Sequence, residues 1–394
     1  MKQALRALLL AGLVGLILGG CRRHESVAEA AKRTNTLILG NLAEPEDLDP
    51  QVVTSYTDIN VTLALFEGLT AVDEVTSQAT PAAAETWNVS ADGLTWTFHL
   101  RAGLTWSNGE ALTADDFIQS WRRMLSPELA AEYSYLLYPI KGAEAFNTGK
   151  TKDVSLLGIS APDPRTVQIV LERPTPYLPI LVSCSAWFPV NMRVLAKFDA
   201  LKRRGTAWTK PGNLVGNGPF VLKTWSPNDK IVVERNPGYW DAGANALNRV
   251  IFRPTESPEV EEHDFRAGQV HITYALPATK IAVYRQNHPA ELRIDPFLQT
   301  FFLRFNVTKK PFGDTRVRQA LSFAIDREAI SHAVLMEAFP PAYSLTPPGT
   351  GGYTARAHWE KLRRGPTAPG RGRIPGRQGL PGHRGAGEER RDSA

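Results

Sequence analysis

Along this chain, segments in which apolar and polar residues alternate are interleaved with segments of helical periodicity, and this interleaving constrains the fold most. Residues 94–100 alternate apolar and polar side chains, which predicts a strand with one buried face. Residues 117–124 instead carry Phe117, Trp121 and Met124 at helical spacing, after a capping-box-like start at Thr113 and Asp116. Strands and helices that alternate in this way favour an α/β or mixed α+β fold.

The same patterns recur elsewhere in the first 340 residues. One helix is expected from Asp58, as its N-cap, to Gly68, with Ile59, Leu63 and Phe66 on one face. Two more are expected from Thr315 onward and after Asp326. Further strands are expected at 36–39, 167–171, 231–234, 250–252 and 270–274.

The first twenty residues are typical of an export signal. Lys2 and Arg6 precede an apolar run at 7–18, which is shorter than the ~20 apolar residues that span a bilayer. Residues 18–21, Leu-Gly-Gly-Cys, resemble the lipobox of bacterial lipoproteins. That resemblance implies cleavage before Cys21, lipid on Cys21 and a polar tether over 21–35. The alternative is an ordinary cleaved signal in which the cysteine is incidental.

The net charge of +5 comes from the two ends of the chain. Residues 1–23 contribute +4 and residues 361–394 contribute +6, so residues 24–360 contribute −5. This distribution argues against nucleic acid as a partner of the folded part. The last 34 residues hold eight Gly and four Pro and no aromatic residue, so we expect disorder from about residue 356.

Motifs for chemistry are mostly missing from the sequence. Residues 142–151 lack the first glycine of a phosphate loop, and neither a zinc-type spacing nor a Gly-x-Ser-x-Gly motif occurs. The acidic cluster 261–264 is interpreted as a solvated charged face rather than a metal site. Cys184 is expected to be a small buried apolar residue rather than a nucleophile. We therefore expect no enzyme activity, no cofactor and no metal, although scattered Ser, His and Asp leave a hydrolase open.

An ordered set of motifs, from about residue 36 to 352, resembles the family 5 extracellular solute-binding proteins of ABC importers, and its oligopeptide-binding members most. The motifs lie at 49–50, 65–69, 96–101, 106–110, 113–117, 216–225, 234–240 and 311–321. Each alone has a structural interpretation, with Trp96, Trp106, Trp121 and Trp240 in the core and Asn108-Gly109 and Asn217-Gly218 in turns. The order and spacing of the whole set carry the resemblance.

The resemblance implies a periplasmic-binding-protein-like, class II (cluster C) fold of two lobes with an extra domain. It implies the following division: signal peptide 1–20, lipidated cysteine and tether 21–35, first lobe 36–67 and 191–297, extra domain 68–190, start of an incomplete second lobe 298–355, and disordered tail 356–394. It also implies a lipid-anchored, exported monomer that captures an extended oligopeptide for an ABC permease and ATPase.

Candidate ligand-binding residues follow from the same resemblance by position. Thr54, Ser55 and Tyr56 match a segment whose backbone pairs with the peptide, and Tyr133 matches a cleft aromatic of the extra domain. Tyr274, Phe301 and Phe302 match stretches that line the cleft near the hinge. For each side chain the alternative is ordinary core packing.

The sequence departs from the family after about Thr354. Family members continue through a second lobe that supplies the charged groups for the peptide ends, whereas here a Gly/Arg/Pro-rich tail begins. That composition is typical of GC-rich DNA read out of frame, so we expect a truncated or frameshifted product with impaired binding. Two alternatives stay open from the sequence: a lipid-anchored envelope hydrolase or nonfunctional remnant, and an RNA-binding tail.

Overall fold

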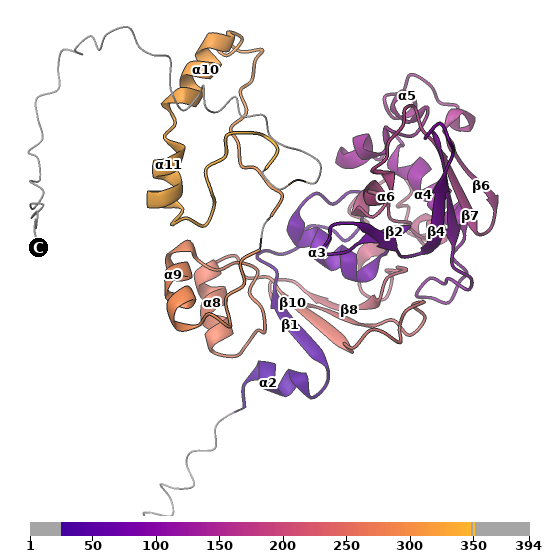
Figure 1. Ribbon diagram of the computed structural model, residues 1–394. Helices are drawn as coiled ribbons and strands as arrows, with labels where there is room; N and C mark the ends of the chain where they lie inside the picture. The colour runs from indigo at the N-terminus through magenta and orange to yellow at the C-terminus, as the bar shows by residue number, and fades with distance from the viewer. Residues whose placement is uncertain (1–24, 296, 348–349, 351–394) are drawn as a thin grey trace, which may run out of the picture. The chain divides into compact units, whose positions relative to one another are not determined.

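The computed structural model describes residues 25–295, 297–347 and 350 (Figure 1). The export signal, Cys21 and the tail from residue 356 lie outside the described residues, so the predictions made for them are not addressed by the structure. The chain divides into two compact units, Met1–Pro277 and Ala278–Ala394, which are described separately below as unit 1 and unit 2. Among the described residues, no helix combines the length and apolar character needed to cross a bilayer.

One four-stranded sheet of unit 1 is built from both ends of the unit. Its strands are β1 (Thr36–Gly40), β8 (Phe220–Ser226), β9 (Lys230–Arg235) and β10 (Arg249–Arg253). Their order is β1-β10-β9-β8, and β1 pairs with β10 in parallel while the other neighbours are antiparallel. The strands predicted at 36–39, 231–234 and 250–252 are confirmed.

The predicted strand at 270–274 is wrong as an extended element. The segment makes a single parallel bridge, between Leu39 and Ile272, beside the free side of β1. The His271 side chain interrupts the ladder. Its Nδ1 accepts a hydrogen bond from the Ile38 amide (2.9 Å), which in a regular strand pair would donate to a backbone carbonyl. The ring's Nε2 lies 3.0 Å from the carbonyl oxygen of Ala28 and donates to it.

The other four-stranded sheet of unit 1 is entirely antiparallel. Its order is β4 (Ala84–Val89), β5 (Thr95–Leu100), β7 (Thr166–Val170) and β6 (Ile159–Asp163). The alternation predicted at 94–100 is confirmed, since Trp96, Phe98 and Leu100 are buried and the residues between them are half-buried. The strand predicted at 167–171 is β7.

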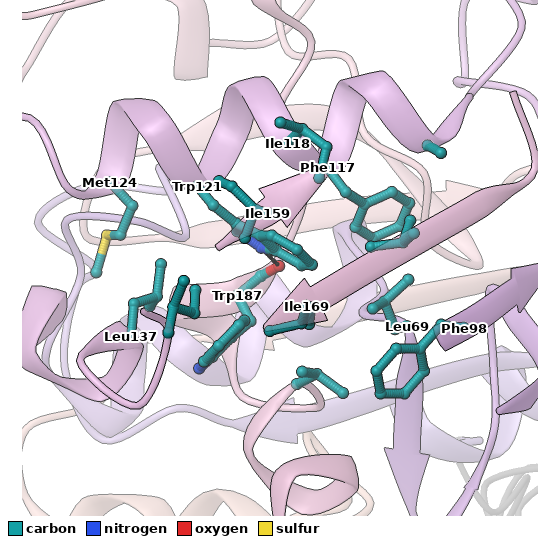
Figure 2. Close-up of a cluster of buried hydrophobic side chains, with 14 of the residues drawn as sticks. Leu69, Phe98, Phe117, Ile118, Trp121, Met124, Leu137, Ile159, Ile169 and Trp187 are labelled. Carbon is teal, nitrogen blue, oxygen red and sulfur yellow. Dashed lines mark hydrogen bonds between the residues drawn. The ribbon is translucent and has the colours of Figure 1, made fainter. Parts of the chain in front are cut away.

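Helix α4 (Ala114–Met124) supplies much of the core beside this sheet (Figure 2). The predicted capping box is present, with the Thr113 amide donating to the Asp116 carboxylate at 2.7 Å. Trp121 donates from Nε1 to the carbonyl oxygen of Trp187 (2.9 Å), and the two rings meet edge to face at 5.2 Å. Trp96, Trp106 and Trp121 are therefore core residues, as predicted, whereas Trp240 is half-buried.

Helix α3 (Tyr56–Leu65) begins earlier than the sequence suggested. Its N-cap is Ser55, whose Oγ accepts the Asp58 amide at 3.2 Å, so the prediction of Asp58 as the cap is wrong. The Asp58 carboxylate is buried and accepts the Glu46 amide instead. The helix buries Val61, Thr62 and Leu65, and the predicted face is wrong because Leu63 is half exposed.

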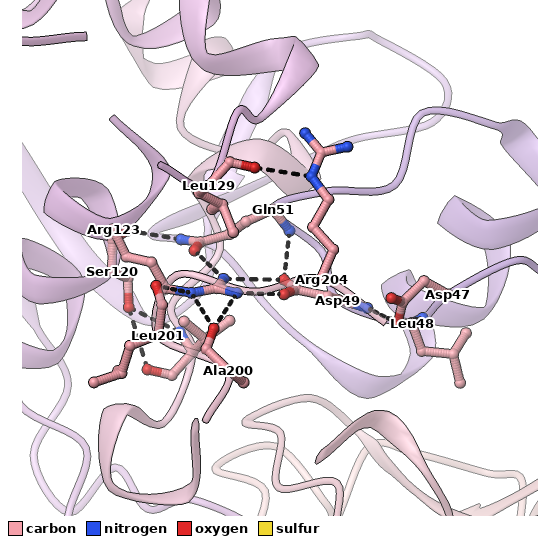
Figure 3. Close-up of polar contacts among 11 residues, drawn as sticks. Asp47, Leu48, Asp49, Gln51, Ser120, Arg123, Leu129, Ala200, Leu201 and Arg204 are labelled. Carbon is pink, nitrogen blue, oxygen red and sulfur yellow. Dashed lines mark hydrogen bonds and ion pairs between the residues drawn. The ribbon is translucent and has the colours of Figure 1, made fainter. Parts of the chain in front are cut away.

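A buried ion pair connects α4 to the loop before α3 (Figure 3). Arg123 and Asp49 meet at 2.7 Å with both side chains almost fully buried. The guanidinium also donates to Gln51 Oε1 (2.7 Å) and to the carbonyl oxygen of Ala200 (2.9 Å). With these partners the buried charges are compensated, which is the condition for tolerating an ion pair away from water.

Glu67 connects three stretches that the sequence keeps apart. Its carboxylate accepts hydrogen bonds from Tyr239 Oη and from Trp240 Nε1, the latter at 2.8 Å. Its backbone N–H and C=O bond the side chain of Asn217, at 3.0 and 2.9 Å. Gly218 packs so closely on the end of α3 that an added Cβ would overlap the backbone of residues 65–66. Three of the sequence motifs thus converge at one corner of unit 1.

The remaining elements of unit 1 are short. They are α2 (Val27–Lys32), within the expected tether, β2 (Thr70–Val72), β3 (Ala79–Pro81), η1 (Glu132–Leu137), α5 (Ala143–Asn147), η2 (Val154–Leu156), α6 (Leu178–Leu181), η3 (Ser185–Trp187), α7 (Met192–Lys197), η4 (Ala207–Thr209) and α8 (Pro258–Arg266). Cys184 is half-buried at the end of α6, and burial raises the pKa of its thiol, in keeping with a structural role.

Unit 2 contains α9 (Ala278–Asn287), α10 (Thr315–Ala324), α11 (Arg327–Ala329) and the π-helical turn η5 (Ile330–Val334). The helices predicted from Thr315 and after Asp326 are confirmed, and Asp326 caps α11 by accepting the Ala329 amide. The side of α10 that carries Val317, Leu321 and Ala324, which its helical spacing predicts as an apolar face, is not buried, because no described residue of that helix is.

Candidate functional site

The segment before α3 combines an extended backbone with open amides. Ser55 has φ −89° and ψ 151°, which is an extended conformation, and its side chain is used for capping α3. Within the described part of the chain, the amide N–H groups of Thr54 and Ser55 donate to no other residue. An extended backbone with unused donors is able to pair with another extended chain.

Tyr133 reaches this segment from the 3₁₀ helix η1. Its Oη lies 3.2 Å from the carbonyl oxygen of Thr54, a long hydrogen bond. Its ring meets that of Tyr135 edge to face, with centroids 6.1 Å apart. Burial raises the pKa of the Tyr133 phenol, and the nearby phenols of Tyr135 and Tyr56 add to the shift. Tyr135, about half exposed, is a member of this group that the sequence analysis missed.

Tyr274 approaches the same place from the segment that follows α8. Burial raises the pKa of its phenol, and Tyr56 and Glu261 add to the effect. Tyr56 therefore lies within electrostatic range of both Tyr133 and Tyr274. Its own side chain is half exposed, and that of Tyr274 is 39% exposed. The structure thus brings five predicted residues together, from three separate parts of unit 1: Thr54, Ser55, Tyr56, Tyr133 and Tyr274.

Phe301 and Phe302 belong to unit 2 and are described only within it. Phe301 is 91% exposed and Phe302 is 54% exposed, so neither is packed in a core. The structure does not bring them together with the tyrosine group, because the two units are not placed relative to each other.

The acidic cluster 261–264 differs from the sequence interpretation. Glu261 and Glu262 of α8 are buried, so the prediction of a solvated face is wrong for these two residues. Sequence pattern alone did not indicate this, because in a run of four polar residues nothing distinguishes the two carboxylates that the helix buries, Glu261 and Glu262, from His263 and Asp264. Glu261 accepts hydrogen bonds from the amides of Tyr274 and Ala275, at 2.7 and 3.2 Å, and so contacts the backbone of a candidate site residue.

Two shallow hollows in the described surface lie elsewhere in unit 1. One, of about 340 Å³, is lined by polar groups of the antiparallel sheet, including Glu85, His99 and Arg165. The other, of about 500 Å³, lies around Glu110, Asp116 and Arg193 near the start of α4. Neither of these two hollows includes a predicted ligand-binding residue.

Comparison with known proteins assigns the chain to a class. A family model, the middle region of the bacterial extracellular solute-binding proteins of family 5, matches residues 78–366. Among curated relatives, the probable deoxycholate-binding periplasmic protein YgiS of Escherichia coli is 40% identical, and the periplasmic oligopeptide-binding protein OppA of Salmonella typhimurium is 38% identical. Each alignment covers 80% of this chain and 57% of the relative.

Solved structures agree with the sequence relatives. Haemophilus influenzae OppA in complex with the peptide RPPGFSPFR superposes with a TM-score of 0.74 at 34% identity, covering 80% of this chain and 60% of that one. The murein tripeptide-binding protein MppA of Escherichia coli gives a TM-score of 0.76 at 34% identity, covering 84% and 64%.

The fold is therefore a mixed α/β fold of the periplasmic-binding-protein type. The chain belongs to family 5 of the bacterial extracellular solute-binding proteins, which confirms the resemblance seen in the sequence. The family consists of substrate-binding proteins rather than enzymes. The chain spans 57% of the length of the two curated relatives named above.

Proposed function

We propose that this chain is the substrate-binding component of an ABC importer and that it captures oligopeptides in an extended conformation. The observation that carries the proposal is the extended backbone of Ser55, with open amides at Thr54 and Ser55 and exposed tyrosines nearby. A peptide added as a strand would receive backbone hydrogen bonds there, which gives affinity that tolerates different side chains. Tyr56, Tyr133 and Tyr274 would supply apolar contact area at a small entropic cost.

Phe301 and Phe302 are the part of this proposal that belongs to unit 2. Both rings are exposed, so each offers apolar contact area to a ligand. The relatives support a peptide ligand, since OppA and MppA are named for peptides and one solved OppA holds a nonapeptide. The hydrolase alternative has no support from this family.

Calorimetry on the purified full chain tests the function. We expect saturable binding of a mixed tri- to pentapeptide pool, and no binding of sodium deoxycholate, the compound for which the relative YgiS is named. Tyr133→Ala should weaken peptide binding about tenfold, ~1.4 kcal/mol, as for an aromatic contact at an interface. Tyr177→Ala is the matched control, because Tyr177 is 56% exposed and is the N-cap residue of α6, outside the tyrosine group. Binding of deoxycholate without peptide binding would contradict the proposal.

We also propose that the chain is exported and held as a monomer on the cell envelope by lipid at Cys21, where it delivers peptide to a permease and ATPase. The lipobox-like residues 18–21 support the anchor. In membrane fractionation, Cys21→Ser should move the protein from the membrane to the soluble fraction, while Cys184→Ser should leave it on the membrane. Equal distribution of the two variants would contradict lipid anchoring.

A further inference from the structure

The segment 271–275 passes from β1 to the end of unit 1 without forming a regular strand. Two backbone hydrogen bonds tie it to β1: the His271 amide donates to Ile38 O (2.8 Å), and the Gly40 amide donates to Ile272 O (2.9 Å). Beyond Ile272 the backbone ladder ends. The amides of Tyr274 and Ala275, which follow Thr273, instead donate to Glu261 Oε2, at 2.7 and 3.2 Å. One carboxylate thus takes the place of a strand neighbour.

The carboxylate of Glu261 occupies space that Gly40 provides. Glu261 is 1% exposed, and a Cβ added to Gly40 would overlap its Oε1 and Cδ. Gly40 has an ordinary backbone conformation, so the glycine is required for this close approach rather than for a left-handed turn. An alanine at position 40 would push the carboxylate away without removing it.

Burying this carboxylate is unfavourable, and the structure compensates it only in part. Oε1 is buried without a hydrogen-bond partner of ordinary geometry among the described residues. Burial raises the pKa of Glu261, and Asp264 adds to the effect, while the amides of Ala275, Tyr274 and Leu42 oppose it. An apolar side chain would avoid burying a carboxylate but would leave the amides of Tyr274 and Ala275 without their acceptor, so the role of Glu261 lies in those two amides.

The two amides that Glu261 holds have distinct positions in the chain. Tyr274 is one of the predicted ligand-binding residues, and its side chain is partly exposed. Ala275 lies two residues before Pro277, the last residue of unit 1, and α9 of unit 2 begins at Ala278. By holding these two amides, Glu261 restrains the backbone from which the Tyr274 side chain projects. It also restrains the last backbone segment before the chain leaves unit 1.

We propose that Glu261, seated against Gly40, is a positioning residue for ligand binding, which holds the backbone of Tyr274 and Ala275 in place just before the chain passes into unit 2. This inference rests on the proposed function for its ligand part only. Glu261 does not touch the ligand; it acts through the backbone of Tyr274 and Ala275.

Hydrogen exchange on the full chain tests the backbone part without any ligand. In Glu261→Ala, exchange of the Tyr274 and Ala275 amides should accelerate at least tenfold, as expected when a hydrogen bond to a charged group is lost. Glu261→Gln keeps an acceptor oxygen and should stay within about threefold of the parent chain. Gly40→Ala should reproduce the acceleration although the glutamate is present. Unchanged exchange in both Glu261→Ala and Gly40→Ala overturns the proposal.

A double-substitution cycle separates positioning from general destabilisation. Once the carboxylate is gone, alanine at position 40 has nothing to displace, so Gly40→Ala with Glu261→Ala should exchange no faster than Glu261→Ala alone. Glu259→Gln on the same helix is the control, because Glu259 is exposed and its carboxylate accepts a hydrogen bond from the nearby Ser257 hydroxyl rather than from the 271–275 segment. Additive acceleration in the double variant overturns the proposal.

Peptide affinity tests the ligand part. Glu261→Ala should weaken peptide binding about tenfold, and Tyr274→Ala should remove that difference, because Glu261 acts through Tyr274. An equal loss in the Tyr274→Ala background would show that Glu261 does not position this side chain. If the parent chain binds no peptide, the proposed function fails together with the ligand part, and the exchange rates still decide the backbone part.

Discussion

At the scale of single residues, Glu67 is the titratable group with the clearest predicted effect. Burial raises the pKa of its carboxyl from 4.5 to about 7, and the hydrogen bonds from Tyr239 and Trp240 oppose this shift only partly. Arg101, which lies over the Trp240 ring at 3.7 Å, also opposes it, while Asp241 adds to it. The folded chain therefore keeps a proton at pH values where the unfolded chain has lost it.

The sign of the pH effect follows from this proton. Between pH 4.5 and about 7 the folded state binds one proton more than the unfolded state, so the free energy of unfolding decreases as pH rises, by up to ~3 kcal/mol, and then levels off. Glu67→Gln should flatten this decrease, because the amide stays neutral. Urea denaturation of both proteins at pH 5 and pH 8 measures the difference. Parallel pH profiles for the two proteins would contradict the assignment.

The Asp49–Arg123 pair gives a second prediction at this scale. Arg123→Met leaves Asp49 buried without its partner, so we expect the free energy of unfolding to fall by about 3–5 kcal/mol. The exposed pair Arg203–Asp199 is the matched control, and Arg203→Met should cost under about 1 kcal/mol. Urea denaturation at pH 7 measures both variants. Similar losses in the two would show that burial does not govern the effect.

At the scale of elements, the sequence predicted correctly those helices and strands whose stabilising interactions lie within the element itself. The strand at 94–100 and helix α4 were predictable, because each buries one periodic face and α4 carries its own capping box. Helix α3 was predicted with the wrong cap and face. Its buried side includes three polar residues, Thr57, Asp58 and Thr62, which an apolar pattern does not reveal. The strand at 270–274 failed because side chains of His271 and Glu261 replace ladder carbonyls, which no periodicity records.

The capping box of α4 gives a prediction at this scale. Thr113→Ala removes the threonine side chain from the N-terminus of the helix that carries Phe117 and Trp121 into the core. We expect a loss of about 1 kcal/mol in the free energy of unfolding, typical of an N-cap threonine. Thr113→Ser keeps the hydroxyl and should restore most of it. Thermal denaturation followed by circular dichroism measures both, and an equal loss in the two variants would contradict a capping role.

At the scale of the whole molecule, the candidate site was predictable only through the motifs. Tyr56, Tyr133 and Tyr274 come from different elements of unit 1, and nothing in their local sequence indicates that they meet. Resemblance placed them by position, and the tertiary fold brings them together. Tyr135 and Glu261 were not predicted as members of the site. Tyr135 contacts the predicted Tyr133, and Glu261 accepts backbone amides of Tyr274 and Ala275 instead of facing solvent.

The two units differ in how much core they contain, and this difference sets their stability. Unit 1 holds two large clusters of buried apolar residues, whereas Tyr284 is the only large apolar side chain buried in the described part of unit 2. Local opening is easiest where few apolar groups are buried. We therefore expect amides of α10 to exchange at least a hundredfold faster than those of β5 and β9 in the same hydrogen-exchange experiment. Equal protection of α10 and β5 would show that unit 2 is stabilised by contacts beyond those within it.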